Sequence, residues 1–89
     1  MPNNLTFWDR VISRKEQQFT INIGKMIIGT YVIPWEATTQ IPAKGTIKPG
    51  TNTVSDLLAA RVKHVSRAVK LNETQWQVTI QFIQPEAYA

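Results

Sequence analysis

The sequence predicts one small domain that is mainly β, with α+β as the alternative: about five strands in a partly open barrel or sandwich, preceded by a short N-terminal helix. Three observations favour this fold class. The 89 residues suffice for a single domain, 1–89, with one modest core. Residues 76–82 alternate between an apolar and a polar face, and residues 19–33 contain two β-rich runs on either side of a glycine.

The N-terminal helix is expected over residues 5–18. Thr6 is a suitable N-cap, and Asp9 three positions later completes an imperfect capping box. Apolar side chains then recur at helical spacing, at Leu5, Trp8, Val11 and Ile12. The alternative is a strand over residues 7–12 with a turn at 13–18, and the local pattern leaves both open.

Residues 19–33 are expected to form a β-hairpin. Gly24 at the first central position suits a type II′ turn at Gly24–Lys25, which would place Phe19 opposite Thr30. The two faces of this hairpin would carry different apolar sets, with Phe19, Ile21, Ile23, Met26 and Ile28 on one and Ile27, Tyr31 and Ile33 on the other. Because the second strand is apolar on both faces, it is expected to lie centrally or against the N-terminal helix.

Residues 34–53 are expected to form an extended, turn-rich connection, because Pro34 ends the strand and further prolines and glycines follow. A loop of this length in a small domain is usually functional or pairs outside the domain. The alternative is a short surface strand at 45–47 with ordinary turns on either side. Trp35, directly after Pro34, is the candidate exposed anchor for a partner; its alternative role is to pack under the loop.

Residues 54–83 are expected to contain the closing strands, although 54–70 also show helical spacing. We expect a short helical turn near 55–58 and a strand from about Ala60. Residues 61–71 would then pair with the strand from Trp76 across a turn at 72–75, and a phase slip between Val62 and Val65 would require a β-bulge.

The C-terminal residues 84–89 are expected to form a tail that leaves the sheet, because Pro85 stops a strand. Tyr88 in this tail is a candidate anchor to the domain itself or to a neighbouring molecule.

The formal net charge is +4, and four basic residues lie close together in the sequence: Arg61, Lys63, Arg67 and Lys70. Such a strip is suited to phosphate contacts, with nearby aromatic rings as stacking platforms. A solvated face with no ligand is the simpler interpretation. Nucleic acid is therefore an alternative partner, next to protein.

Several function classes have no support in the sequence. There is no cysteine and only one histidine, so neither disulfides nor the usual metal sites are expected. His64 has no carboxylate or nucleophile at a recognisable spacing, and the acidic residues are scattered singly. We therefore expect no enzyme, no cofactor and no catalytic residue. The polar N-terminus predicts no signal peptide, and the longest apolar run, 26–33, is too short for a bilayer, so a virion or cytoplasmic location without a membrane is expected.

Residues 56–82 contain Asp56–Leu57–Leu58 and the run from Arg61 to Arg67, followed by a short loop, an aromatic residue and the alternating strand. This pattern resembles the closing hairpin of phage tail and baseplate hub β-domains. Arg67 stands where a histidine is common, and hub proteins are much longer. PilZ-type barrels close similarly, but their motifs for a cyclic dinucleotide are missing here. The resemblance implies a structural β-module in an assembly, with no active site.

These observations predict a non-catalytic structural or interaction module that forms a homo-oligomer or joins a larger protein assembly, with a small phage virion or tail component as its most specific form. Two alternatives stay open. One is a small nucleic-acid-binding β-barrel that uses the basic strip. The other is a small inhibitor or adaptor that docks on a larger protein.

Overall fold

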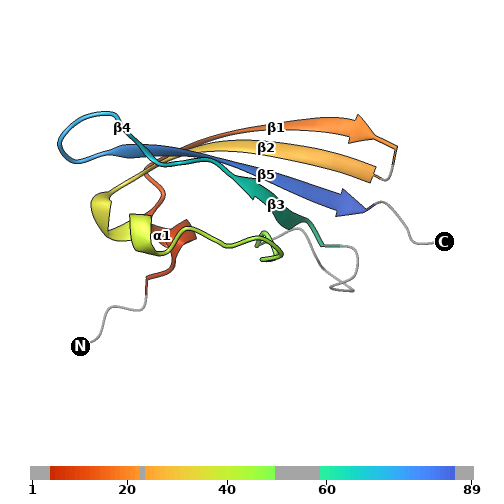
Figure 1. The fold of residues 1–89 in the computed structure, drawn as a ribbon, viewed down its shortest axis with the longest axis horizontal. Coiled ribbons are helices and arrows are strands. Elements are labelled where there is room, and N and C mark those ends of the chain that lie inside the picture. Colours follow the sequence, from red (N-terminus) through yellow and green to blue (C-terminus); the bar gives the residue numbers. More distant parts are fainter. Residues whose placement is uncertain (1–4, 23, 50–58, 86–89) are drawn as a thin grey trace.

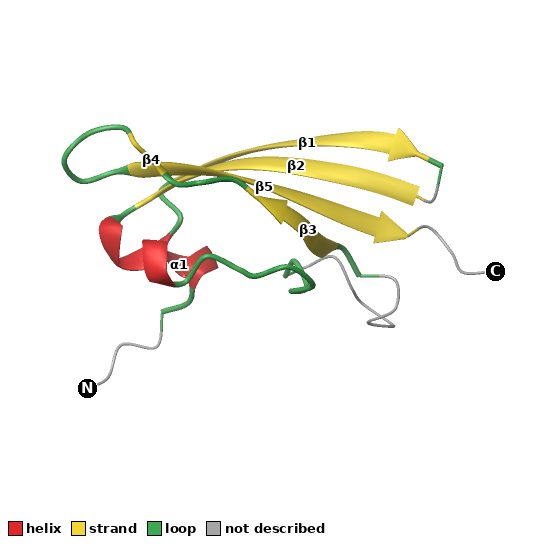
Figure 2. Ribbon diagram, viewed as in Figure 1, coloured by secondary structure: helices red, strands yellow, loops and turns green. Residues whose placement is uncertain are grey.

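The chain folds into a five-stranded antiparallel sheet that is not closed, with one short helix. The computed structural model describes residues 5–22, 24–49 and 59–85. The strands are β1 (Ser13–Ile21), β2 (Gly24–Ile33), β3 (Arg61–Val65), β4 (Val69–Lys70) and β5 (Trp76–Pro85), in the spatial order β1-β2-β5-β3 with β4 also paired to β5 (Figure 1). The α-helix α1 (Phe7–Arg10) and the 3₁₀ helix η1 (Trp35–Thr39) lie on one side of the sheet (Figure 2). The predicted fold class is thus confirmed.

The N-terminal helix is much shorter than predicted. Its start is as expected, because the Asp9 amide donates to Thr6 Oγ1 at 3.3 Å and the Thr6 amide donates to Asp9 Oδ2 at 3.0 Å. The helix ends after four residues, where Val11 takes an extended conformation, and β1 begins at Ser13. The prediction of a helix over 5–18 is therefore wrong, as is the alternative strand over 7–12. Pairing with β2 satisfies the backbone of residues 13–21, and such tertiary contacts override a weak local helical pattern.

The predicted hairpin is present, but in another register. Ile21 pairs with Gly24 and Phe19 with Met26, so Gly24 begins β2 and the predicted Gly24–Lys25 turn is wrong. Gly24 has φ +146°, so its conformational freedom serves the entry into the strand. Phe19 was expected opposite Thr30 and lies opposite Met26, so the register differs by an even number of residues. Because side chains alternate between faces, an even shift leaves each of them on its predicted face.

The closing strands were predicted more closely. β3 starts at Arg61, β4 and β5 flank the turn at 72–75, and the register shifts between Val62 and His64, where a bulge was expected. β5 extends to Pro85, which pairs with Gly24, so the prediction that the tail leaves the sheet from residue 84 is wrong. Residues 86–89 lie outside the described part of the chain, and so does the helical turn predicted near 55–58.

The connection after β2 has more regular structure in its described residues, 34–49, than the extended loop predicted over 34–53, and residues 50–53 lie outside the described part of the chain. η1 occupies its start, and residues 45–48 run along β3. Gly45 donates its amide to the Val62 carbonyl at 2.8 Å, Val62 donates to Thr46 at 2.9 Å, and Lys48 donates to the Ala60 carbonyl at 2.8 Å. The alternative of a short strand at 45–47 was close to the observed arrangement, since Ile47 forms a bridge with Arg61.

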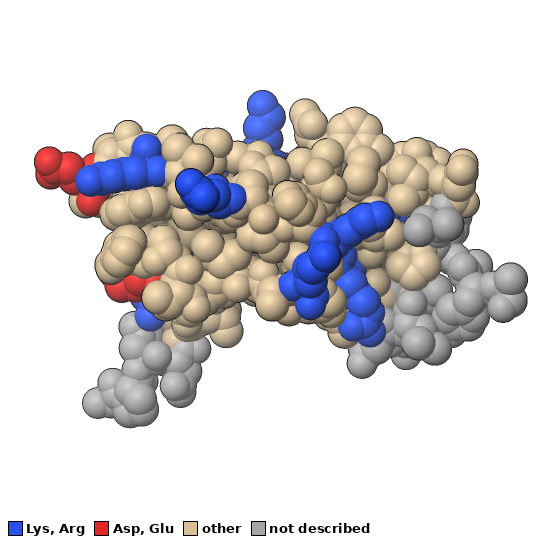
Figure 3. Space-filling view, viewed as in Figure 1, with Lys and Arg blue, Asp and Glu red and all other residues tan. Residues whose placement is uncertain are grey.

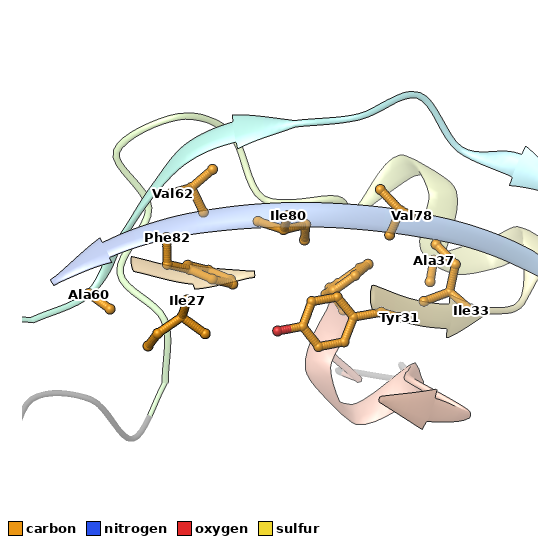
Figure 4. Close-up of a cluster of buried hydrophobic side chains, with 10 residues drawn as sticks. Ile27, Tyr31, Ile33, Ala37, Ala60, Val62, Val78, Ile80 and Phe82 are labelled. Carbon is orange, nitrogen blue, oxygen red and sulfur yellow. The ribbon is translucent and has the colours of Figure 1, made fainter. Parts of the chain in front are cut away.

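The hydrophobic core lies between the sheet and the helices. Its largest fully buried side chains come from the two central strands and are Tyr31, Ile33, Val78, Ile80 and Phe82 (Figure 4). Trp8 from α1 covers them, with its ring 5.3 Å from Tyr31 and 6.0 Å from Phe82. The core therefore stands on one face of β2 and β5, as the alternation of residues 76–82 predicted.

The opposite sheet face carries the alternate residues of each strand, and no described helix covers it (Figure 2). Met26, Ile28 and Ile83 are half-buried there, and Phe19 at the edge is 43% exposed. We call this surface the open face.

Side chains connect the two edges of the sheet on the core side. Glu16 of β1 accepts a hydrogen bond from the Tyr31 hydroxyl at 2.6 Å and forms an ion pair of 3.2 Å with Lys48, which lies in the segment beyond β3. The Lys48 ammonium also stands 5.8 Å from the Phe82 ring centroid. The sheet is not closed by backbone pairing. The contact between Glu16 and Lys48 nevertheless links β1 at one edge to residues 45–48, which lie beside β3 at the other edge.

Candidate interaction surfaces

An exposed group of aromatic and aliphatic side chains lies at one end of the sheet. We call it the aromatic end. Trp35, Lys70 and Trp76 form its core side, whereas Val69 and Leu71 alternate with Lys70 along the chain and therefore lie toward the open face. Pro34 ends β2 and starts η1, which projects Trp35 so that 61% of its surface is exposed. Its ring centroid is 5.1 Å from that of Trp76, at an interplanar angle of 50°. The predicted anchor is therefore exposed on one side while it packs against a second tryptophan.

The rest of the aromatic end is fixed by β4 and the turn that follows it. Lys70 pairs with Trp76 across the ladder, and its ammonium stands 5.9 Å from the indole centroid, a favourable cation–π geometry. Val69 is 57% and Leu71 47% exposed. Leu71 donates its amide to the Gln75 carbonyl at 2.9 Å, which closes the turn. These apolar side chains are thus presented by a hydrogen-bonded backbone rather than by a loose loop.

A second surface is a shallow, open groove of about 600 Å³ beside β3. Its lining is basic at the rim and largely apolar between, and comprises Lys44, Gly45, Arg61, Val62, Lys63, Ile83 and Pro85. The Arg61 guanidinium donates to the Gly45 carbonyl at 3.1 Å, which fixes its position. Figure 3 shows Lys and Arg side chains gathered over β3 and the segment beside it. We call this feature the basic groove.

The predicted basic strip is thus divided by the fold. Arg61 and Lys63 line the basic groove, whereas Lys70 belongs to the aromatic end and Arg67 lies in the connection between β3 and β4. Sequence reasoning missed Lys44, which the pairing of residues 45–48 with β3 brings to the groove. The alternative of a strand at 45–47 was the signal that would have pointed to it. Tyr88, the other predicted partner contact, lies outside the described residues.

The third surface is the edge strand β1. Counted over whole residues, all of β1 except Ile21 is exposed, although only 29% of the Glu16 side chain is. The strand pairs with β2 along its whole length. Lys15, Gln17 and Phe19 share the open face, whereas Glu16 points to the core side and reaches Lys48. β1 is long for an edge strand, and its second half carries no charge.

Within the described ranges, no group of three or more His, Cys, Asp or Glu residues is placed to hold a metal ion. His64 is exposed on β3, opposite Gln81. Asp9 is engaged in capping α1, and the hydrogen bonds to Thr6 lower the pKa of its carboxyl. None of the described helices is both long enough and apolar enough to cross a membrane.

Comparison of the chain with protein families, with curated proteins and with solved structures found no match.

Proposed function

We propose that the protein is a non-catalytic structural or interaction module that assembles with itself or with larger partners, and in its most specific form is a small virion or tail component. The observation that carries this proposal is the exposure of Trp35, whose ring is held in position by its contact with Trp76. The resemblance of residues 56–82 to phage hub hairpins supports the more specific form.

The physical argument is the cost of leaving this surface in water. Tryptophan is enriched among the few residues that dominate binding energies, because its large ring loses little conformational entropy on burial. Burying a large apolar side chain contributes about 1.5–3 kcal/mol. Trp35 is already oriented by its contact with Trp76, and the exposed Val69 and Leu71 add apolar area at the same end of the sheet, toward its other face. A partner that covers the aromatic end would gain this energy on a surface that is already in place.

The test is association measured by sedimentation velocity from micromolar to millimolar concentration, together with tryptophan fluorescence. We expect the wild-type chain to associate, with a blue shift in emission as Trp35 leaves water, and Trp35→Ala to weaken association. Thr46→Ala changes an exposed side chain away from the aromatic end and serves as the matched control. Association and emission that do not respond to concentration or to Trp35→Ala would contradict assembly through this surface.

Binding of a nucleic-acid backbone is a second candidate, favoured by the three cations around the basic groove. Phosphates neutralise such a surface and release counterions, so affinity falls with salt in proportion to the number of contacts. We expect weak binding of single-stranded or duplex DNA at low salt, and a slope of log affinity against log salt that decreases by about one for each of Lys44→Ala and Lys63→Ala. Lys25→Ala lies outside the groove and should leave the slope unchanged. No binding at low salt would exclude this function.

A further inference from the structure

The outer side of β1 is an unpaired edge of the sheet. β1 pairs with β2 on one side, and no described residue pairs with its other side. At the opposite edge, by contrast, residues 45–48 cover part of β3. A nine-residue strand with a free row of N–H and C=O groups is a template for another strand.

The hairpin register shows which residues of β1 face outward. Ile21 and Gly24 are partners with two residues between them, so we expect them to be a hydrogen-bonded pair, as in two-residue hairpins. The odd-numbered residues of β1 then direct their backbone groups toward β2. The even-numbered residues, from Arg14 to Thr20, direct theirs outward.

Because only the even-numbered residues direct their backbone groups outward, two antiparallel copies of β1 can pair in a limited set of registers. Outward groups must meet outward groups, so a residue with an even number must oppose another with an even number. Residues of equal parity share a face of the strand, so the two core sides come to lie on the same face of the joint sheet. The symmetry axis is therefore a two-fold perpendicular to the sheet.

The charges of β1 then exclude part of the registers. A two-fold at position 14, 15 or 16 would place Arg14, Lys15 or Glu16 directly opposite the same residue of the second copy, and like charges in that position are destabilising. The second half of the strand has no charge, so the two-fold is allowed at Gln17 and beyond. Charged side chains on an edge strand normally prevent it from pairing with another chain. In β1 they exclude the registers centred on positions 14 to 16 and leave the others possible.

Among the allowed registers, the one centred on Gln17 aligns the whole strand, with Ser13 opposite Ile21 of the second copy. A centre at position 18 or 19 leaves residues at the start of the strand unpaired. In the Gln17 register, Lys15 lies opposite Phe19 of the second copy on the open face, a suitable cation–π pair, and Phe19 has 43% of its surface exposed to receive it. Glu16 lies opposite Gln18 of the second copy, and its charge is already paired with Lys48.

We propose that two copies of the chain pair through β1, antiparallel and about a two-fold axis at Gln17, so that their sheets become continuous. This deepens the proposed function, since it names a second copy of the chain as a partner and β1 as the surface. The two open faces would join across the interface, with Lys15 and Phe19 of each copy in contact with the other.

Single cysteines test the register directly, because the chain contains no cysteine of its own. The two Gln17 residues would form a non-hydrogen-bonded pair with Cα atoms about 4.5 Å apart, which is within disulfide range. The two Gln18 residues would be diagonal neighbours about 7–8 Å apart, which is beyond it. We expect Gln17→Cys to form a disulfide-linked dimer under mild oxidation, and Gln18→Cys and the collision control Glu73→Cys to form little.

A charge at the two-fold gives an independent test that needs no cross-link. Gln17→Lys would place two ammonium groups opposite each other, and we expect it to weaken dimerisation about two- to fivefold at low salt, with recovery at high salt. Gln17→Ala, at the same exposed position, should show no such salt-dependent loss.

The outcomes separate this inference from the proposed function. Cross-linking of Gln17→Cys with salt-dependent loss in Gln17→Lys supports the β1 dimer. Cross-linking of Gln18→Cys instead would overturn the Gln17 register. A wild-type chain that associates while no β1 variant cross-links or responds to charge would overturn the β1 dimer but leave the assembly function in place. A wild-type chain that stays monomeric at millimolar concentration would overturn the β1 dimer as well.

Discussion

Glu16 makes two polar contacts on the core side of the sheet, one with the Tyr31 hydroxyl and one with the Lys48 ammonium. Burial opposes ionisation of its carboxyl, but the hydrogen bond from Tyr31 and the charge of Lys48 outweigh burial and lower its pKa below the ordinary value of 4.5. Burial and the neighbouring Glu16 carboxylate raise the pKa of Tyr31 above its ordinary value of 10.0. The native state therefore favours an ionised Glu16 and a protonated Tyr31.

These two shifts predict a stability profile with a loss at each end of the pH range. A carboxyl whose pKa is lowered on folding stabilises the native state above about pH 4.5, and this contribution is lost as the pH falls through the native pKa. A phenol whose pKa is raised stabilises it below about pH 10, and this contribution is lost as the pH rises further. Urea unfolding across pH should show the acid loss reduced in Glu16→Gln and the alkaline loss reduced in Tyr31→Phe. Profiles in which either variant parallels the wild type would contradict this assignment.

Gly29 allows Tyr31 to reach Glu16. Gly29 is buried in β2 opposite Glu16, and a Cβ added there would collide with the Tyr31 hydroxyl and ring. Gly29→Ala should therefore displace the ring, break its hydrogen bond and destabilise the fold by about 1–3 kcal/mol. Thermal or urea unfolding measures this cost. Because loss of the hydrogen bond to Glu16 is part of this cost, Gly29→Ala should cost less in a Tyr31→Phe background. An equal cost would show that the hydrogen bond is not part of it and that the ring collision alone accounts for the effect.

At the scale of elements, the bulge in β3 allows both Val62 and Val65 to face the core. Val62 and Val65 both pair with core residues of β5 although they are an odd number of positions apart, and the register shift between Val62 and His64 absorbs the difference. Deleting Lys63 should therefore leave a regular strand with both valines still inward, and the variant should unfold cooperatively. Deleting Thr79 from the central strand β5 should move Ile80 to the open face and abolish cooperative unfolding. Circular dichroism during heating distinguishes the two deletions. If both variants lost cooperative unfolding equally, the role given to the bulge would be contradicted.

The elements also show what the sequence could predict. The capping box at Thr6, the alternation of residues 76–82 and the bulge are local patterns, and all three were predicted. The helix over 5–18 was predicted wrongly, because the residues that keep 13–21 extended are in β2 and the local sequence does not contain them. The hairpin register was missed for the same reason, since Gly24 fits a turn as well as the start of a strand.

The candidate surfaces were predictable to a similar degree. Trp35 was predicted as exposed because Pro34 ends the preceding strand, but its contact with Trp76 joins positions far apart in the chain. The basic strip was a sequence cluster, and the fold keeps only Arg61 and Lys63 of it together while it adds Lys44. Proximity in sequence is a poor guide to a surface in a sheet whose neighbouring strands are distant along the chain.

For the whole molecule, the central question is how an open sheet holds its two edges in position. Backbone pairing links β1 to β2 and residues 45–48 to β3, and the Glu16–Lys48 ion pair of 3.2 Å is a direct link between these two ends. The two side chains are only 29% and 12% exposed, so solvent screens them less than a surface pair. The contact is thus placed to couple the stability of the two edges.

A double-mutant cycle measures that coupling. Lys48→Met keeps the apolar stem over Phe82 but removes the charge, and Glu16→Gln keeps an acceptor for the Tyr31 hydroxyl but removes the partner charge. Each single change should destabilise the fold because it leaves the other charge partly buried without the opposite charge beside it. The double change should cost less than the sum, with a coupling energy of about 0.5–3 kcal/mol in urea unfolding at neutral pH. Lys25→Met in place of Lys48→Met is the control and should show no coupling with Glu16→Gln. If the Lys48 cycle is also additive, the edges are held by backbone pairing and core packing alone, and the ion pair has no part in coupling them.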